Sequence, residues 1–281
     1  MVERKGISYL RCGLDVLTGL FTLWLFGLLV LGVWCSALKS TNAQSAGMPI
    51  NSSSSQSETI LPGQIIDKVQ CLDDLAQSYA LYLPSNYSKD RAWPILYAFD
   101  PAARGKQPVA RYREAAEKYG WIVVGSNNSR NGPIQQSFLA WSALWKDSHG
   151  RFSIDPRRTY ITGFSGGARM AILFAIRCGD CVAGVIASSA GFPEGIAPSR
   201  TMSFALFGTA GQEDFNLPEI KSLEDTLTKS AIAHRVEVFP GRHEWPSPSL
   251  AMEGIEWLEL QAMRRGARLR DNELIEHMFP K

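Results

Sequence analysis

The stretch from Tyr160 to Met170, YITGFSGGARM, constrains the fold of this chain more than any other. It contains Gly163-x-Ser165-x-Gly167, with a β-rich run before it and an apolar run free of Gly and Pro after it. In a strand–turn–helix context, G-x-S-x-G forms a nucleophile elbow, a strained turn that lifts a serine hydroxyl out of a sheet. The alternative is a glycine-rich turn with an incidental serine. We predict the elbow, because strand, turn and helix signals are all present.

The first 39 residues differ in character from the rest of the chain. A net-basic head is followed by residues 16–38, which carry no charge and are rich in Leu, Phe, Trp and Val. That run is longer than the ~7–15 residues of a signal-peptide core and close to the ~20 residues that span a bilayer. Two interpretations stay open: a cleaved signal peptide, with residues 41–43 as the cleavage site, or an uncleaved membrane anchor, which the length favours. Both predict export of the remainder to the periplasm or the extracellular space.

Residues 40–59 are rich in Ser, Asn, Gln and Thr and include four consecutive serines from Ser52. A segment of this composition lacks the apolar side chains needed to fold, so we expect a flexible linker. The globular domain is then residues 60–281.

Charge argues against nucleic acid as a partner. The chain has 29 Lys and Arg and 27 Asp and Glu, of which residues 1–43 hold four and two, so the remainder carries 25 of each. No basic cluster rises above this neutral background.

Short apolar strands alternate with helical segments from Ile60 onward. This pattern is typical of an α/β fold with a mostly parallel sheet covered by helices on both faces. The expected strands are 63–70 and 78–84, as an antiparallel pair, then 94–99, 121–125, 158–162, 182–188, 203–207 and 235–239. The expected helices are 109–119, 134–146, 168–177, 218–230 and 249–263.

A serine hydroxyl becomes a nucleophile only with a nearby base, and that base needs an orienting carboxylate. In proteins with this elbow the chain order is Ser, acid, His. Among the four histidines, His149 precedes Ser165, His234 opens a strand and His277 lies in a charged tail. His243 lies in a turn-rich loop after the last expected strand, so we predict that it is the base rather than a solvated loop residue.

The acid is expected after the strand 203–207, where Glu213 and Asp214 are adjacent. Asp is the commoner orienting residue, so we predict Asp214 and keep Glu213 as the alternative.

Two N–H groups are expected to bind the developing oxyanion. The first is that of Gly166, at the start of the helix after the elbow. The second should come from the loop after the strand 94–99, where Pro101 has no N–H. Ala102 or Ala103 remains, and we predict Ala102. Asp100 and Arg104, in the same loop, are expected to form an ion pair.

Three cysteines lie beyond the linker. Cys178-Gly-Asp-Cys181 favours a local disulfide in an exported protein. A zinc site would need a second ligand pair. A redox role or a pair of buried thiols stays open, and Cys71 is left unpaired.

The chain resembles the α/β-hydrolase superfamily, near the polyhydroxybutyrate depolymerase, feruloyl esterase and dienelactone hydrolase-like esterases. The matching pieces are YALYLP at 79–84, RTYITGFSGG at 158–167, GT at 208–209 and HEWP at 243–246. The resemblance implies a triad of Ser165, Asp214 and His243. One departure concerns the second oxyanion donor and the acyl pocket: relatives often carry His-Gly where this chain has Asp100-Pro101.

Residues and resemblance together predict a serine hydrolase that cleaves carboxylic esters through an acyl-enzyme intermediate. The expected substrate is a small-molecule or polymer-derived ester, and no metal or organic cofactor is expected. Membrane contact is expected only through an uncleaved N-terminal segment, and the sequence does not address oligomeric state. The alternatives are a serine peptidase or acyltransferase with the same triad, or a catalytically silent, membrane-tethered binding protein.

Overall fold

The structure is a computed structural model that describes residues 60–280. The predicted signal peptide or anchor (1–39) and the predicted linker (40–59) lie outside the described residues.

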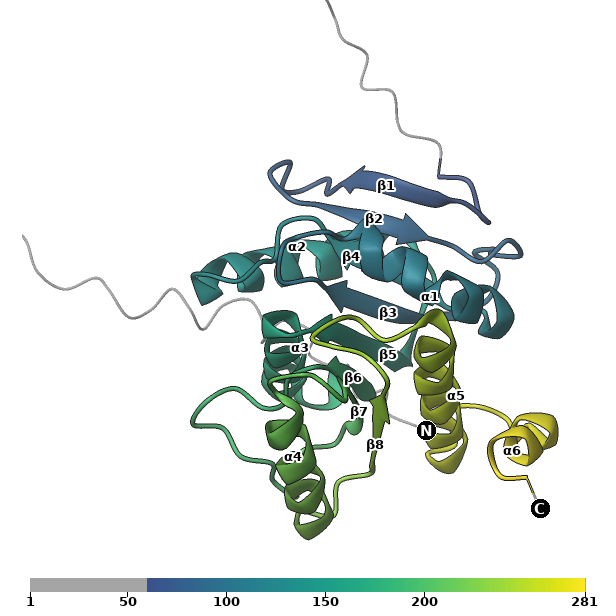
Figure 1. Cartoon of the computed structure of the whole chain (residues 1–281). Coiled ribbons are helices and arrows are strands. Elements are labelled where there is room, and N and C mark those ends of the chain that lie inside the picture. Colours follow the sequence, from purple (N-terminus) through teal and green to yellow (C-terminus); the bar gives the residue numbers. More distant parts are fainter. Residues whose placement is uncertain (1–59, 281) are drawn as a thin grey trace, which may run out of the picture. The chain divides into compact units, whose positions relative to one another are not determined.

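An eight-stranded sheet runs through residues 60–280, with the strand order β1-β2-β4-β3-β5-β6-β7-β8 (Figure 1). β2 is antiparallel to both of its neighbours, and the other strands are parallel to one another. The strands are β1 (Ile65–Gln70), β2 (Ser78–Tyr82), β3 (Trp93–Phe99), β4 (Ile122–Ser126), β5 (Ile154–Phe164), β6 (Gly184–Ser188), β7 (Ala205–Gly211) and β8 (His234–Phe239). The predicted antiparallel entry pair and the mostly parallel sheet are both confirmed.

The inner strands are apolar on both faces because helices cover both faces. Every residue of β3, β4, β6 and β7 is buried. The main helices are α1 (Lys106–Tyr119), α2 (Ile134–Arg151), α3 (Gly166–Cys178), α4 (Leu217–Lys229) and α5 (Pro248–Arg264).

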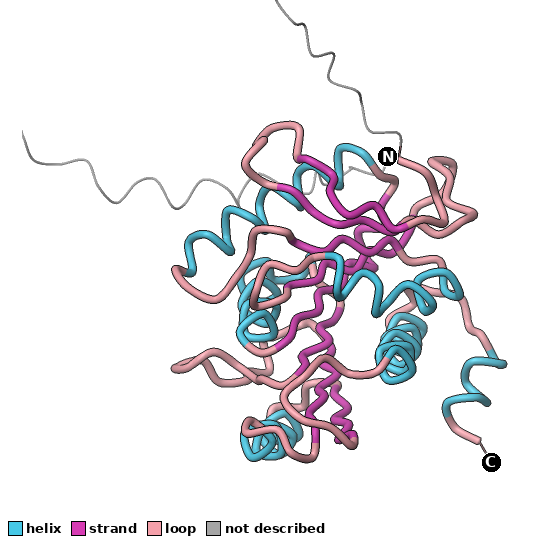
Figure 2. Tube along the Cα trace, turned by 45° about the horizontal axis from the view of Figure 1, so that its top comes forward, coloured by secondary structure: helices cyan, strands magenta, loops and turns pink. Residues whose placement is uncertain are grey.

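Two apolar cores lie on the two sides of the sheet. One is built with side chains of α2, α3 and α4, and the other with side chains of α1 and α5. Figure 2 shows the strands running between helices in this arrangement. The predicted α/β fold is therefore the observed one.

Helix ends follow local chemistry. α1 ends where Gly120 adopts φ 70°, as the glycine after an amphipathic helix predicts. α2 continues to Arg151, beyond the predicted end at Lys146. The predicted charged tail contains a further short helix, α6 (Asn272–Met278), which Asp271 caps by accepting from the Leu274 N–H at 3.0 Å. Among residues 60–280, no helix is both long and apolar enough to cross a bilayer.

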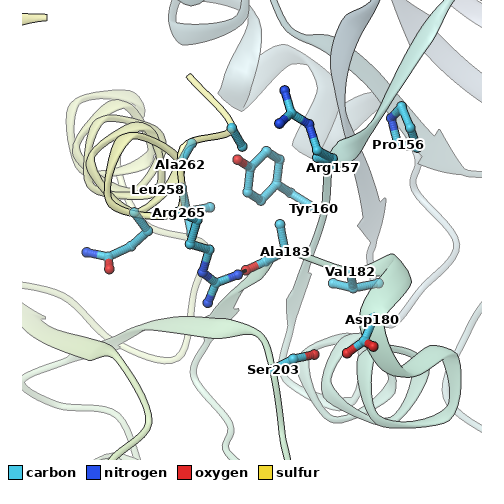
Figure 3. A pocket seen from close by; sticks show the side chains of 12 residues that line it. Pro156, Arg157, Tyr160, Asp180, Val182, Ala183, Ser203, Leu258, Ala262 and Arg265 are labelled. Atoms are coloured by element: carbon cyan, nitrogen blue, oxygen red, sulfur yellow. Dashed lines mark hydrogen bonds between the residues drawn. The ribbon is translucent and has the colours of Figure 1, made fainter. Parts of the chain in front are cut away.

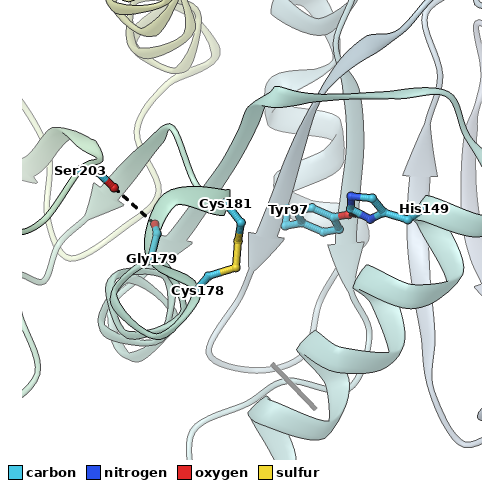
Figure 4. Close-up of a disulfide and its surroundings, with 6 residues drawn as sticks. All are labelled: Tyr97, His149, Cys178, Gly179, Cys181 and Ser203. Atoms are coloured by element: carbon cyan, nitrogen blue, oxygen red, sulfur yellow. Dashed lines mark hydrogen bonds between the residues drawn. A yellow bond between two sulfur atoms is a disulfide. The ribbon is translucent and has the colours of Figure 1, made fainter. Parts of the chain in front are cut away.

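Cys178 and Cys181 are bonded at the carboxyl end of α3, with Cα atoms 5.6 Å apart (Figure 4). This is the predicted local disulfide. Cys71 is buried, and burial raises the pKa of its thiol to about 12. Such a thiol stays protonated at neutral pH and is a poor nucleophile.

The parallel strands bring distant loops to one edge of the sheet. β5 ends at Phe164, directly before the predicted nucleophile, and β3 ends at Phe99, directly before Asp100. Asp214 follows β7, and His243 follows β8. In an open α/β sheet the crevice outside the carboxyl ends of the strands is where ligands bind.

Candidate active site

Ser165 occupies the strained turn that the elbow motif predicts. Its φ is 52° and its ψ is −122°, a region that a residue with a side chain rarely adopts. The flanking glycines are required by close approach: a Cβ at Gly163 would collide with the carbonyl of Gly167, and a Cβ at Gly167 would collide with that of Phe99. The turn is thus packed directly against the end of β3.

A continuous chain of hydrogen bonds joins the three predicted side chains. Ser165 Oγ lies 2.9 Å from His243 Nε2, and His243 Nδ1 lies 2.9 Å from Asp214 Oδ1. A carboxylate only accepts hydrogen bonds, so Nδ1 donates to Asp214. In the neutral imidazole Nε2 is then free to accept the Ser165 proton.

Asp214, and not Glu213, faces the histidine. The Asp214 side chain has no exposed surface, and its Oδ1 also accepts from the Asn216 N–H at 2.8 Å. Glu213 points outward, with 69% of its side chain exposed, and pairs with Arg242 at 3.1 Å. Asp214 is therefore a buried carboxylate beside His243, whereas Glu213 is an exposed carboxylate beside Arg242.

Two phenylalanines contact the imidazole of His243. Phe164, next to Ser165 in sequence, has its ring centre 4.8 Å away, and Phe215, next to Asp214, stacks on the imidazole at 4.1 Å. Phe215 remains 72% exposed. An apolar ring is thus held in solvent beside the catalytic base that we predict.

Asp100, the first residue of the loop after β3, binds Arg104 of the same loop and Trp245 of the loop after β8. Its buried carboxylate accepts from Arg104 Nε at 2.8 Å and from Trp245 Nε1 at 2.9 Å. Burial raises the pKa of Asp100, but the hydrogen bonds from Arg104, Trp245 and the Ala102 N–H lower it by more, so it lies below its usual range. The predicted ion pair with Arg104 is present, and Trp245 is an additional partner.

Both N–H groups considered for the second oxyanion position already have partners. The Ala102 N–H donates to Asp100 Oδ1 at 2.9 Å, and the Ala103 N–H donates to the Asp100 carbonyl at 3.0 Å. Ala102, the predicted second oxyanion donor, therefore has its N–H engaged by the Asp100 carboxylate in this structure.

The Gly166 N–H, by contrast, has no partner inside its helix, since it belongs to the first residue of α3. The side chain of Asn131, from the loop between β4 and α2, lies against the Gly166 Cα, where a Cβ would collide with it.

A half-buried ion pair joins the elbow helix α3 to α4. Arg169 donates to both carboxylate oxygens of Glu219 at 2.7 Å, and Glu219 also accepts from the Gly191 N–H at 2.9 Å. Burial raises the pKa of Glu219, but these donors lower it by more. Because Gly191 lies in the loop after β6, the pair holds this loop close to α3.

A cavity of about 230 Å³ lies away from these residues, near the amino ends of β6 and β7 (Figure 3). Its lining includes Tyr160, Val182, Leu258 and Arg265 and none of the predicted site residues.

Solved structures similar to this chain are described as serine hydrolases and esterases. A ferulic acid esterase gives a TM-score of 0.58 at 16% identity over 72% of this chain and 100% of that one. A fluorophosphonate-binding serine hydrolase from Staphylococcus aureus gives 0.56 at 15% identity over 70% and 98%. An S-formylglutathione hydrolase from Agrobacterium tumefaciens gives 0.51 at 15% identity over 72% and 94%.

No family model matches the chain, and neither does any curated protein. Identities this low establish the fold and nothing finer. The chain has the α/β-hydrolase fold, as its resemblance to esterases of that fold implied.

Sequence reasoning missed three features of the site: the Asp100–Trp245 contact, the stacked Phe215 and the Asn131 side chain. Only their positions in the sequence could have indicated these residues, since each follows the carboxyl end of a strand or lies near a predicted site residue. Side-chain direction within those loops was not encoded in any periodic pattern.

Proposed function

We propose that this protein is a serine-dependent hydrolase of carboxylic esters, with Ser165 as nucleophile, His243 as general base and Asp214 as the orienting acid. The observation that carries the proposal is the unbroken hydrogen-bond path from Ser165 Oγ through both imidazole nitrogens to the buried Asp214 carboxylate. It fits the arrangement that activates a serine hydroxyl.

In this mechanism His243 Nε2 takes the hydroxyl proton as Ser165 Oγ attacks the ester carbonyl. The Gly166 N–H stabilises the oxyanion of the tetrahedral intermediate. Asp214 stabilises the imidazolium, which then gives its proton to the leaving alcohol. A water molecule attacks the acyl-enzyme by the same route and releases the carboxylic acid.

Esters are the substrate class that the neighbours favour over amides or acyl transfer. Similar structures are described as a ferulic acid esterase, a feruloyl esterase module and a thermostable esterase. These names support the choice of bond, and a screen of acyl-chain lengths and aromatic esters would identify the acyl and alcohol groups.

The test is hydrolysis of 4-nitrophenyl acetate by the full-length chain and by Ser165→Ala. We expect a burst of 4-nitrophenol equal to the enzyme concentration, followed by slower turnover. The variant should lose roughly 10³–10⁶-fold in turnover with an unchanged melting temperature. A variant that keeps near wild-type turnover would refute the proposal.

We also propose that the hydrolase domain works outside the cytoplasm, exported or tethered through residues 16–38, because this uncharged run follows a net-basic head. Protease added to intact spheroplasts should degrade the domain, and full protection would contradict export. A mature protein that begins near Gln44 would exclude the anchor.

A further inference from the structure

Acyl transfer at a serine normally uses two hydrogen-bond donors on the oxyanion, and this site has one obvious donor. The Gly166 N–H is free of helical partners. The neighbouring N–H groups of Ala102 and Ala103 are both taken up by Asp100. Breaking the Ala102 bond would leave a buried, charged acceptor with one partner fewer, which is costly. A second donor must therefore come from another element.

Asn131 lies at the right place. Its side-chain amide occupies the space that a Cβ would fill in any other residue at position 166, with Oδ1 nearest to that point and Nδ2 3.2 Å from it. Its amide makes no hydrogen bond to another residue of 60–280, and the residue is exposed. A primary amide carries two N–H donors, so Asn131 has unused donors next to Gly166.

The backbone of Asn131 is fixed relative to the elbow even though its side chain is exposed. Its N–H donates to the Pro101 carbonyl at 2.9 Å, and Arg130 pairs with Ala102 in an isolated β-bridge. Asp100, which precedes Pro101, is held by Arg104 and Trp245. The loop after β4 is therefore attached to the loop after β3, and this attachment fixes the backbone that carries the Asn131 amide.

We propose that the Asn131 side-chain amide is the second oxyanion donor, acting together with the Gly166 N–H. This inference rests on the proposed esterase function. It also gives a reason for glycine at position 166, because any larger residue would displace the amide. Rotation by 180° about the Cβ–Cγ bond exchanges the positions of Nδ2 and Oδ1. The two groups are nearly equal in size, so Nδ2 can occupy the position of Oδ1 and donate to the oxyanion.

The test compares Asn131→Ala and Asn131→Asp with Gln136→Ala in the full-length protein. Gln136 is an exposed amide in the first turn of α2 and serves as the matched control. Asn131→Ala should lower kcat by roughly 10²–10³-fold, the loss typical of one oxyanion donor. KM should change less than about threefold, because the donor acts on charge that develops in the transition state. Asn131→Asp keeps the shape but only accepts hydrogen bonds, so it should lose at least as much.

A trifluoromethyl ketone provides the second readout, since Ser165 adds to it and leaves an oxyanion in the same hole. Its inhibition constant should rise in Asn131→Ala by the same factor as kcat falls. If Asn131 had a purely structural role, Asn131→Asp would keep near wild-type kcat, because it keeps the shape of the side chain. The affinity for the ketone would then also stay unchanged. Gly166→Ala should lower kcat by about the same factor as Asn131→Ala, because its methyl group would displace the amide. The double variant should lose no more than either single variant, since both substitutions remove the same hydrogen bond to the oxyanion.

Turnover within about threefold of wild type in both Asn131 variants would overturn the proposal and return the role to Ala102. A fall in kcat without a matching fall in ketone affinity would also overturn it. A wild-type protein that neither hydrolyses esters nor binds the ketone would instead refute the proposed function, and this inference with it.

Discussion

Trp245 Nε1 donates a hydrogen bond to Asp100 Oδ2 across 2.9 Å, and both side chains are almost completely buried. Trp245 lies two residues after His243, and Asp100 begins the loop after β3. The indole also lies 5.6 Å from the ring of Phe164, which precedes Ser165, the proposed nucleophile. One contact thus connects the loop that carries His243, the proposed base, with the loop that begins at Asp100.

Replacing Trp245 by Phe should impair turnover more than its conservative size change suggests. Asp100 Oδ2 would keep only the Arg104 guanidinium, at 3.1 Å, at a cost of about 1–3 kcal/mol in unfolding free energy. A loosened His243 loop should lower kcat/KM by up to ~10²-fold. Trp145→Phe is the control, because the Trp145 indole has no hydrogen-bond partner among residues 60–280. Equal losses of kcat/KM in the two variants would argue against the connection.

The Asp100 carboxylate should also make stability depend on pH. Its folded pKa lies below the value of about 3.9 expected in the unfolded chain. A depressed folded pKa contributes stability that is present above the unfolded pKa and is lost as the pH falls through the folded one. The melting temperature of wild type should therefore exceed that of Asp100→Asn at pH 7, and the gap should shrink below about pH 4. A gap that stays constant between about pH 3 and pH 7 would contradict this role of Asp100.

Asp214→Asn and Glu213→Gln should differ sharply in activity. The first change presents an amide to His243 and should reduce kcat by roughly 10⁴-fold, because it disturbs the imidazole tautomer. The second affects only an exposed pair with Arg242 and should leave kcat within about twofold. Steady-state kinetics under identical conditions compare the two variants. A large loss in the Glu213 variant with a mild one in the Asp214 variant would mean that the acid is Glu213.

Glu259 should be among the most costly residues to truncate outside the site. Its side chain is fully buried and binds Arg158, Arg268 at 2.6 Å and the Trp121 indole. Glu259→Ala would leave these partners uncompensated and should lower the unfolding free energy by about 3–5 kcal/mol. Asp67→Ala breaks an exposed pair with Lys106 and should cost about 0–1 kcal/mol. Chemical denaturation measures both, and similar values would contradict the buried-network interpretation.

The fold and the position of the elbow were predictable because both depend on repeating or local patterns. Continuous apolar strands indicated a sheet buried on both faces, and β3 is buried throughout. The Gly163-x-Ser165-x-Gly167 spacing is set by backbone collisions within one turn and with Phe99. Chain order then restricted the predicted base to His243, whose Nε2 lies 2.9 Å from Ser165 Oγ.

Contacts between loops were not predictable in the same way. The Ala102 N–H was expected to be free, but the buried carboxylate of Asp100 accepts it, and Asn131 approaches from a loop that no motif connects to the elbow. α6 was missed because it buries Leu274 alone, which is too little for a periodic apolar signal. Its capping residue, Asp271, was the only local indication of a helix start.

The central claim is that Ser165 is a nucleophile activated by His243. A fluorophosphonate reacts covalently with such a serine, and peptide mass spectrometry locates the adduct. We predict a single adduct on Ser165 in the full-length protein, no adduct in Ser165→Ala, and labelling at least ~10³-fold slower in His243→Ala, since removing the base removes most of the activation. An unlabelled wild-type protein, or an adduct on another serine that persists in Ser165→Ala, would contradict the claim.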